Sequence, residues 1–422
     1  MANAFTKQEQ VMFDDVIEGF DDMLVVGKAA ELYNNGLSDQ QEQRAGDQFW
    51  IPAPMISTSF DGFDQSSNFG DTTELSVPVS IGYHKSVPIK YSAKELRNSM
   101  SLERKGKAAK QKLASDVNLA LFNTVALQGG VFSKRASAAT GYDDVADLDS
   151  RLARVGVMPG DRYAFYAPSV MNAMAGNLAS RSEDSARSRS AYENAVIRHD
   201  VAGFKVMKND QEILLAAATG GSTTVNGANQ YTVPKATSTA GTGESANVDN
   251  RYTDLAITAT TYANVKVGDA FTIAGVNSVH MITKQDTGQL QTFRVVGKPS
   301  AGVVRIYPAI ISGTGGTRPE LEYKNCTAAP ANGAAITWLN TVSGPVNPFF
   351  KKESLLLLPG SFSVDAGDGW SVMSATTSLG INITYVRQGE INDISVKARW
   401  DLDFGTALVN PQLAGAQMFS QT

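Results

Sequence analysis

The stretch "NVDNRYTDLAITATTYANVKVGDAFTIAGV", residues 247–276, determines how the rest of the chain is interpreted. It contains two short apolar runs of β type, residues 255–257 and 271–273, separated by turn signals. In the run "VKVGDAF" the turn residues are Gly268 and Asp269, and Gly275 opens the next turn. Since a tight turn of this kind needs a positive φ, we expect replacement of Gly268 by Val to lower the folding yield.

The same pattern of short β runs separated by turn residues extends over residues 211–338. Signals for helices disappear there, and further β runs occur at residues 293–296 and 303–307. Five or six short strands at a spacing of about ten residues predict a small barrel or sandwich. The sequence on both sides has an α/β texture, so this β unit is expected to be inserted between two halves of one domain.

The N-terminal segment predicts an amphipathic helix. Thr6 followed by Glu9 has the spacing of a capping box. The apolar positions recur at three- and four-residue steps, at Phe13, Val16, Ile17, Phe20 and Leu24. The helix either packs on its own domain or docks as an arm on a neighbouring subunit, and Phe13 and Phe20 are the contact candidates for the second role.

Residues 49–91 predict a long two-stranded excursion. Apolar residues alternate from Leu75 to Tyr91, which indicates half-exposed strands, and Pro78 and Pro88 place these strands at sheet edges. The tip, "STSFDGFDQSSNFGDTT", carries three aromatic contact candidates: Phe60, Phe63 and Phe69. An isolated two-stranded ribbon is marginally stable, so we expect it to rest on another subunit.

The strongest helix signal covers residues 101–128. Ala109, Leu113, Val117, Leu121 and Val125 follow one another at steps of four, and Gly129 and Gly130 end the pattern. Its four lysines between residues 105 and 112 are a solvated face or a phosphate-facing patch. Residues 143–209 and the segment after residue 338 predict α/β units.

Composition excludes several classes of function. The 422 residues carry a net charge of −5, so no global basic field attracts nucleic acid. No motif for a phosphate loop, a zinc protease, a serine hydrolase or a redox dithiol is present. His84, His199 and His280 are scattered, and the group Asp143, Asp144 and Asp147 is explained by helix capping or by a cation. We therefore predict no enzyme, no metal and no cofactor.

The N-terminal region and the single cysteine give the expected compartment. Five acidic residues interrupt the first apolar stretch, which argues against a signal peptide, and no apolar run reaches the roughly 18 residues of a membrane span. Cys326 alone cannot form an intrachain disulfide. We expect a soluble protein of the cytoplasm without membrane contact.

The order of these parts resembles the major capsid proteins of tailed double-stranded DNA phages, which share the Hong Kong 97-type fold. The resemblance lies in "GVMPGDRYAFYAPSVMNAM", "VAGFKVMKN" and the closing "RWDLDFGTALVNPQLAG", and in their order along the chain. Residues 247–276, followed by "QTFRVV" at residues 291–296, look like the insertion domain of coat proteins from short-tailed phages that use a separate scaffolding protein.

The resemblance implies an α+β fold with seven segments. These are an N-terminal arm (1–35), an extended loop (50–90, reaching outward over 51–79), a peripheral domain with a spine helix (91–140), an axial domain (141–210 and 339–392), an inserted barrel-like β domain (211–338), and a peripheral strand with the C-terminus (393–422). Within the insertion, the loop 234–247 is the place of an intercapsomer contact, and its ionisable residues are Lys235 and Glu244.

The implied function is that of a shell subunit. Hexamers and pentamers would assemble non-covalently with a scaffolding protein in the host bacterial cytoplasm, with a portal protein at one vertex and weak, non-specific contact with packaged DNA. An alternative stays open, namely an exported β-rich adhesion or glycan-binding structural protein.

Overall fold

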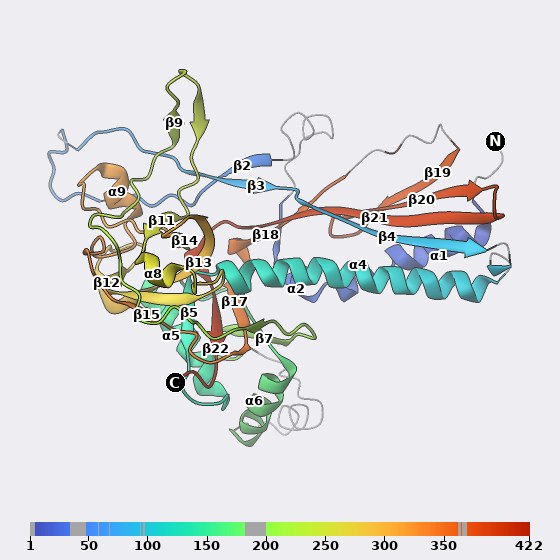
Figure 1. Ribbon diagram of the computed structural model, residues 1–422, viewed down its shortest axis with the longest axis horizontal. Helices are drawn as coiled ribbons and strands as arrows, with labels where there is room; N and C mark the ends of the chain where they lie inside the picture. Colours follow the sequence, from blue (N-terminus) through green and yellow to red (C-terminus); the bar gives the residue numbers. More distant parts are fainter. Residues whose placement is uncertain are drawn as a thin grey trace. The chain divides into compact units, whose positions relative to one another are not determined.

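The computed structural model describes residues 5–33, 48–57, 59–66, 68–92, 94–95, 98–181, 200–361, 364 and 369–422 (Figure 1). The chain divides into two compact units. Unit 1 consists of Met1–Phe49, Val79–Phe122 and Leu355–Ala407. Unit 2 consists of Trp50–Pro78, Asn123–Ser354 and Leu408–Thr422.

Unit 1 contains a mixed sheet and the helices that cover it. The strands follow the order β1 (Glu31–Leu32), β18 (Leu355–Pro359), β21 (Ser395–Leu408), β20 (Asn382–Glu390) and β19 (Trp370–Thr376), and β4 (Tyr83–Ser92) pairs with β21 as well. The helices are α1 (Lys7–Ile17), η1 (Asp21–Met23), α2 (Val25–Ala29) and α4 (Ser99–Gln128), whose last turns belong to unit 2. The long helix therefore ends where Gly129 and Gly130 predict it.

Helix α1 packs against its own sheet and its own long helix. The predicted capping box is present, with Thr6 Oγ1 accepting from the Glu9 backbone and Glu9 Oε2 accepting from the Thr6 backbone. The Phe13 ring stacks on Trp400 at 5.7 Å, and Phe20 is completely buried. Of the two predicted roles of this helix, packing on its own domain is the one observed. As contact residues for a neighbouring subunit, Phe13 and Phe20 are wrong, because their rings lie in the interior of unit 1.

The predicted excursion is shorter than residues 50–90. Its first part holds, since β2 (Gln48–Pro52) and β3 (Ser76–Ser80) form a two-stranded sheet around the loop of residues 53–75. The second part is wrong, because β4 pairs with β21 from Ser92–Ser395 to Tyr83–Phe404 and so belongs to the sheet of unit 1. In the described pairing β4 is an edge strand, as Pro88 predicts.

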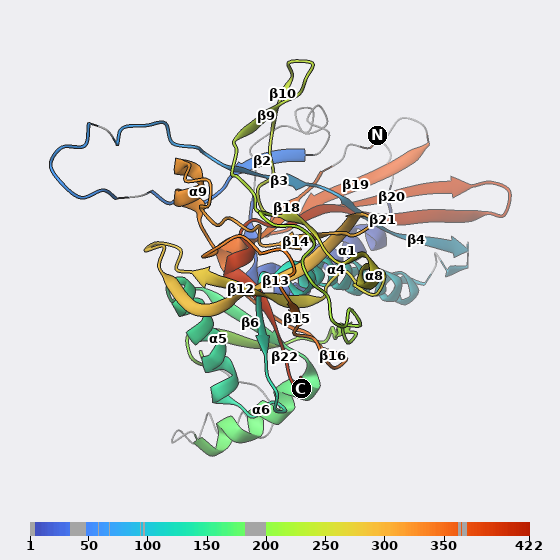
Figure 2. The same ribbon diagram turned by 60° about the vertical axis from the view of Figure 1, so that its left-hand side comes forward.

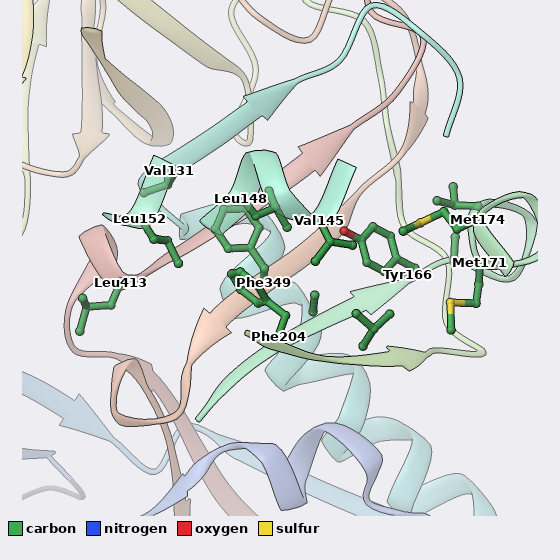
Figure 3. Packing of buried hydrophobic residues seen from close by; sticks show 14 of the residues in the cluster. Val131, Val145, Leu148, Leu152, Tyr166, Met171, Met174, Phe204, Phe349 and Leu413 are labelled. Carbon is green, nitrogen blue, oxygen red and sulfur yellow. The ribbon is translucent and has the colours of Figure 1, made fainter. Parts of the chain in front are cut away.

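Unit 2 contains a five-stranded mixed sheet with two helices. The order is β5 (Val131–Lys134), β22 (Ala414–Met418), β17 (Asn347–Lys351), β6 (Arg162–Tyr166) and β7 (Phe204–Lys208). Helix α5 (Tyr142–Val155) contributes Val145, Leu148 and Leu152 to a core with Phe204 and Phe349, and α6 (Pro168–Arg181) contributes Met171 and Met174 (Figure 3). Strands from both sides of residues 211–338 therefore complete one sheet, as predicted.

The predicted boundary near residue 392 is wrong. The resemblance predicts that residues 339–392 complete the sheet of 141–210 and that residues 393–422 join the long helix. Of the described strands in the first segment, β17 joins that sheet, whereas β18, β19 and β20 form the sheet of unit 1 with β21. Conversely, the C-terminal β22 returns to the sheet of unit 2. Hydrogen bonding between strands that are far apart in the sequence determines these boundaries, and local sequence patterns do not predict which strands pair.

Residues 211–338 form a second, wholly antiparallel five-stranded sheet in unit 2. Its order is β11 (Thr253–Ala256), β14 (Val303–Tyr307), β13 (Asp286–Ser300), β12 (Ala270–Val279) and β15 (Ile336–Trp338). Around this sheet lie two short helices, α8 (Ala259–Tyr262) and α9 (Arg318–Tyr323), so the expectation of a stretch without helix is wrong.

The smaller elements are two strand pairs and two 3-10 turns. The pairs are β8 (Leu214–Leu215) with β16 (Gly344–Pro345) and β9 (Thr237–Thr239) with β10 (Ser245–Asn247), and the turns are η3 (Lys352–Ser354) and η4 (Pro411–Leu413).

One further segment joins the two edges of this sheet. Thr224 bridges Ala335 beside β15, and Val225 bridges Ile257 beside β11. The Val225 amide donates to Ala334 at 2.9 Å, and the Asn226 amide donates to the Ala256 carbonyl at 3.0 Å. The backbone thus runs almost continuously around a core that includes Phe271, Phe293 and Ile306.

Candidate functional site

The polar residues that sequence analysis considered for chemistry have structural partners. Asp144 caps α5, accepting from the amides of Thr140 (2.6 Å) and Gly141 (3.0 Å). Burial opposes ionisation of Asp147, but hydrogen bonds from Arg151 and Ser133 outweigh it and hold the pKa of this carboxyl below its ordinary value. Among the described residues, no group of three or more His, Cys, Asp or Glu side chains could hold a metal ion.

The two described histidines also have local roles. His84 on β4 contacts Asp403, and Arg399 binds Asp401 with two bonds of 2.6 and 2.7 Å beside it. His280 accepts from the amides of Ile282 (3.3 Å) and Thr283 (3.2 Å) at Nδ1, which fixes the tautomer and the connection after β12. The remaining candidate, His199, lies outside the described residues.

The loop of residues 53–75 presents aromatic rings and carboxylates to solvent. Phe63 is completely exposed, and Phe69 and Phe60 are exposed to 86% and 48%. Figures 1 and 2 show the loop as the blue trace between β2 and β3, extending away from the sheets of unit 2. Asp61, Asp64, Asp71 and Glu74 lie in the same loop. It combines aromatic and acidic side chains that are exposed to solvent in the described part of unit 2.

The apex and the return arm of this loop are held by hydrogen bonds. The Gln65 amide donates to the carbonyls of Asp61 (3.1 Å) and Gly62 (2.7 Å), and the Ser66 amide donates to Asp64 Oδ1 (3.0 Å). On the return arm, Arg318 donates to the Gly70 carbonyl at 2.6 Å, and the Tyr323 hydroxyl donates to the Thr73 carbonyl at 3.0 Å. Helix α9 thus anchors the loop.

A pocket lies at the root of the same loop. Its volume is about 120 Å³, and its mostly apolar wall includes Ile56, Leu75, Met281, Pro308, Ile311 and Tyr323. Arg251, Lys284 and Lys324 also line it, and we name it the Lys284 pocket. Burial lowers the pKa of the Lys284 ammonium to about 8. No sequence pattern indicated this pocket, because its lining comes from seven separate parts of the chain.

The hairpin β9–β10 is the second projecting element of unit 2 (Figure 2). Lys235 lies before this hairpin and Glu244 lies in its turn, and both side chains are exposed. Asn250 holds its base, accepting from the Lys235 amide at 3.0 Å and donating to the Lys235 carbonyl at 2.8 Å. Gly268 has a φ of +95° in the turn before β12, as predicted, and the buried Asp269 accepts from the Lys266 amide at 2.8 Å. Gly275 has a φ of +80°, but the turn predicted there is wrong, because Gly275 lies within β12, where the register with β13 shifts between Thr272 and Asn277.

A projecting acidic and aromatic loop and a projecting hairpin are features expected of structural proteins that associate through extended elements. Within this class, the family model described as "P22 coat protein - gene protein 5" matches residues 1–420. The chain therefore belongs to the P22 coat protein family. It is a tailed-phage major capsid protein that forms the shell, and the alternative of an exported adhesion protein is not supported.

Solved structures give three similarities. A structure from Mycobacterium phage Che8 is 10% identical, with a TM-score of 0.40, and the match covers 92% of this chain and 93% of that one. The CUS-3 coat protein I-domain is 42% identical, with a TM-score of 0.21, over 28% of this chain and 96% of that one. The capsid of cyanophage P-SCSP1u is 12% identical, with a TM-score of 0.39, over 89% and 83%. In the described part of the chain, no helix is long and apolar enough to cross a membrane.

Proposed function

We propose that this coat protein assembles non-covalently into hexamers and pentamers of an icosahedral procapsid, with the help of a scaffolding protein. The observation that supports the proposal most directly is the loop of residues 53–75. Burying one exposed Phe side chain stabilises a contact by about 1.5–3 kcal/mol, so three such rings on one loop favour contact with another subunit. Phe60, Phe63 and Phe69 are the proposed contact residues.

Residues 211–338 are proposed to be an inserted β domain that stabilises the subunit. Its separate apolar core and its nearly closed backbone support this role. The hairpin β9–β10 is proposed to contact the next capsomer, with Lys235 and Glu244 as its ionisable residues. Because solvent screens such exposed charges, this contact depends more on backbone fit than on ion pairs.

The remaining partners follow from the same proposal. Assembly takes place in the host cytoplasm, with a portal protein at one vertex of the Hong Kong 97-type shell. Packaged double-stranded DNA makes weak, non-specific contact with the interior. The net charge of −5 supports weak contact, because strong binding to phosphate requires a basic surface.

Co-expression with a candidate scaffolding protein, followed by negative-stain imaging, tests the proposal. Closed shells of uniform size are expected with the scaffolding protein, and irregular products without it. Replacing Phe63 and Phe69 by Ala should leave the subunit folded, because neither ring supports its core, but should reduce the shell yield. Discrete monomers or dimers under all conditions would contradict the proposed function.

A further inference from the structure

We propose that the Lys284 pocket of one subunit receives the Phe63 ring and the carboxylates of Asp61 and Asp64 from the loop of a second copy of this chain. The inference rests on the proposed shell function and names the receiving site for the loop. Three properties of the described residues support it: the size of the pocket, its two lysines that form no ion pair, and the shape of the loop apex.

The pocket has the size of one aromatic ring. Its volume is about 120 Å³. An apolar cavity of about 150 Å³ takes up benzene, so a cavity of this size that is also open to solvent can hold a phenyl group. Its wall of Ile, Leu, Met, Pro and Tyr side chains offers the apolar contacts that such a ring requires. The pocket therefore suits a Phe side chain from outside.

The charge of the pocket favours an acidic partner. Arg251 is neutralised by Asp249 at 2.7 Å, and Glu322 is taken up by Arg318 at 2.9 Å. Lys284 donates to the Lys324 backbone carbonyl at 3.2 Å, and neither lysine forms an ion pair with a carboxylate in the described part of the chain. Burial is the main cause that lowers the pKa of Lys284; Glu322 attracts its ammonium group, and the ammonium group of Lys324 repels it more weakly. A carboxylate that binds there would offset the repulsion between Lys284 and Lys324 and would replace the hydration that the Lys284 ammonium loses on burial.

The loop apex carries the complementary groups in fixed positions. Phe63 lies between Asp61 and Asp64, and Gly62, with φ of +102°, makes the turn. The bonds from Gln65 and to Asp64 described above stiffen this turn. A preorganised apex loses less conformational entropy on docking than a flexible one. Ring and carboxylates therefore enter the pocket as one unit.

A second copy is the partner that fits these observations. The Phe63 ring of the chain itself is completely exposed, so it does not occupy its own pocket. The return arm of the loop is hydrogen-bonded to α9 at Gly70 and Thr73, which keeps the loop apex away from the pocket of the same chain. Membership of a shell-forming family brings identical copies into contact, so one copy can supply the loop and the next the pocket.

Disulfide trapping in assembled particles tests the inference. In the double variant Phe63→Cys and Met281→Cys, mild oxidation should produce a ladder of linked chains that disappears with reductant. Because Cys326 is completely buried, it does not compete. The matched control pairs Phe63→Cys with Met158→Cys, an exposed residue that does not line the pocket, and should give no ladder.

A charge exchange gives an independent test that does not depend on oxidation. Lys324→Glu and Asp64→Lys should each lower particle yield by about tenfold, which corresponds to about 1.4 kcal/mol per contact. Combining both changes in one chain should restore the yield. Lys266→Glu, at an exposed lysine that does not line the pocket, should not be rescued by Asp64→Lys.

The outcomes separate the inference from the proposed function. Particles without a ladder, an intrachain disulfide in place of the ladder, or a charge exchange without rescue would overturn the docking inference while leaving shell assembly intact. Failure of the unmodified chain to form particles under any condition would instead contradict the proposed function.

Discussion

At the residue scale, Gly268 and Gly275 form a matched pair for separating backbone strain from crowding. Both have a positive φ, which costs an L-residue about 1–2 kcal/mol. A Cβ on Gly268 would lie 3.1 Å from Leu127 Cδ2 and 3.2 Å from Leu215 Cδ1, whereas a Cβ on Gly275 would meet no atom within 4 Å. We expect Gly268→Ala to lower the free energy of unfolding by more than Gly275→Ala, as measured by urea denaturation. Equal losses would show that crowding is unimportant.

Lys284 gives a pH-dependent prediction at the same scale. Its pKa falls from 10.5 when unfolded to about 8 when folded, so between these values the unfolded chain holds the proton and stability rises with pH. Lys284→Met removes a partly desolvated charge. It should raise unfolding stability by about 1 kcal/mol below pH 8, after allowance for solvent screening, with no gain above pH 10.5. Thermal melts across this range measure the effect, and a constant gain at every pH would contradict it.

At the element scale, α1 is held on α4 by backbone acceptors at its C-terminal end. Lys110 is buried, and its Nζ donates to the Asp15 carbonyl at 2.7 Å and to the Glu18 carbonyl. Lys110→Met keeps most of the apolar stem but leaves these carbonyls unsatisfied, at a cost of about 1–3 kcal/mol. Hydrogen exchange over residues 7–17 should therefore become faster. Lys107→Met, which removes only an exposed pair with Glu103, is the control and should leave it unchanged.

Local patterns predicted most elements but not their partners. The period of two identified β4 as a strand and the four-residue steps identified α4, because burial of one face determines these periods, while Pro88 placed β4 at an edge. The partner of β4 is β21, about 300 residues away, and any strand with a free edge would satisfy the same pattern. The loop rings at Phe60, Phe63 and Phe69 could be predicted, since exposed aromatic residues stand out. The Lys284 pocket could not, because tertiary folding alone assembles its wall.

At the scale of the whole molecule, the proposed assembly depends on packing and charge and not on covalent bonds. The docking of Phe63 with Asp61 and Asp64 leaves every side chain chemically unchanged, and the buried Cys326 has its pKa raised to about 12, which disfavours the reactive thiolate. Assembled particles boiled in SDS should therefore give a single band at 45.0 kDa, with or without reductant. The Phe63→Cys and Met281→Cys particles supply the positive control, because their ladder should vanish only after reduction. A ladder from the unmodified chain that resists reductant would mean that a bond other than a disulfide joins neighbouring subunits.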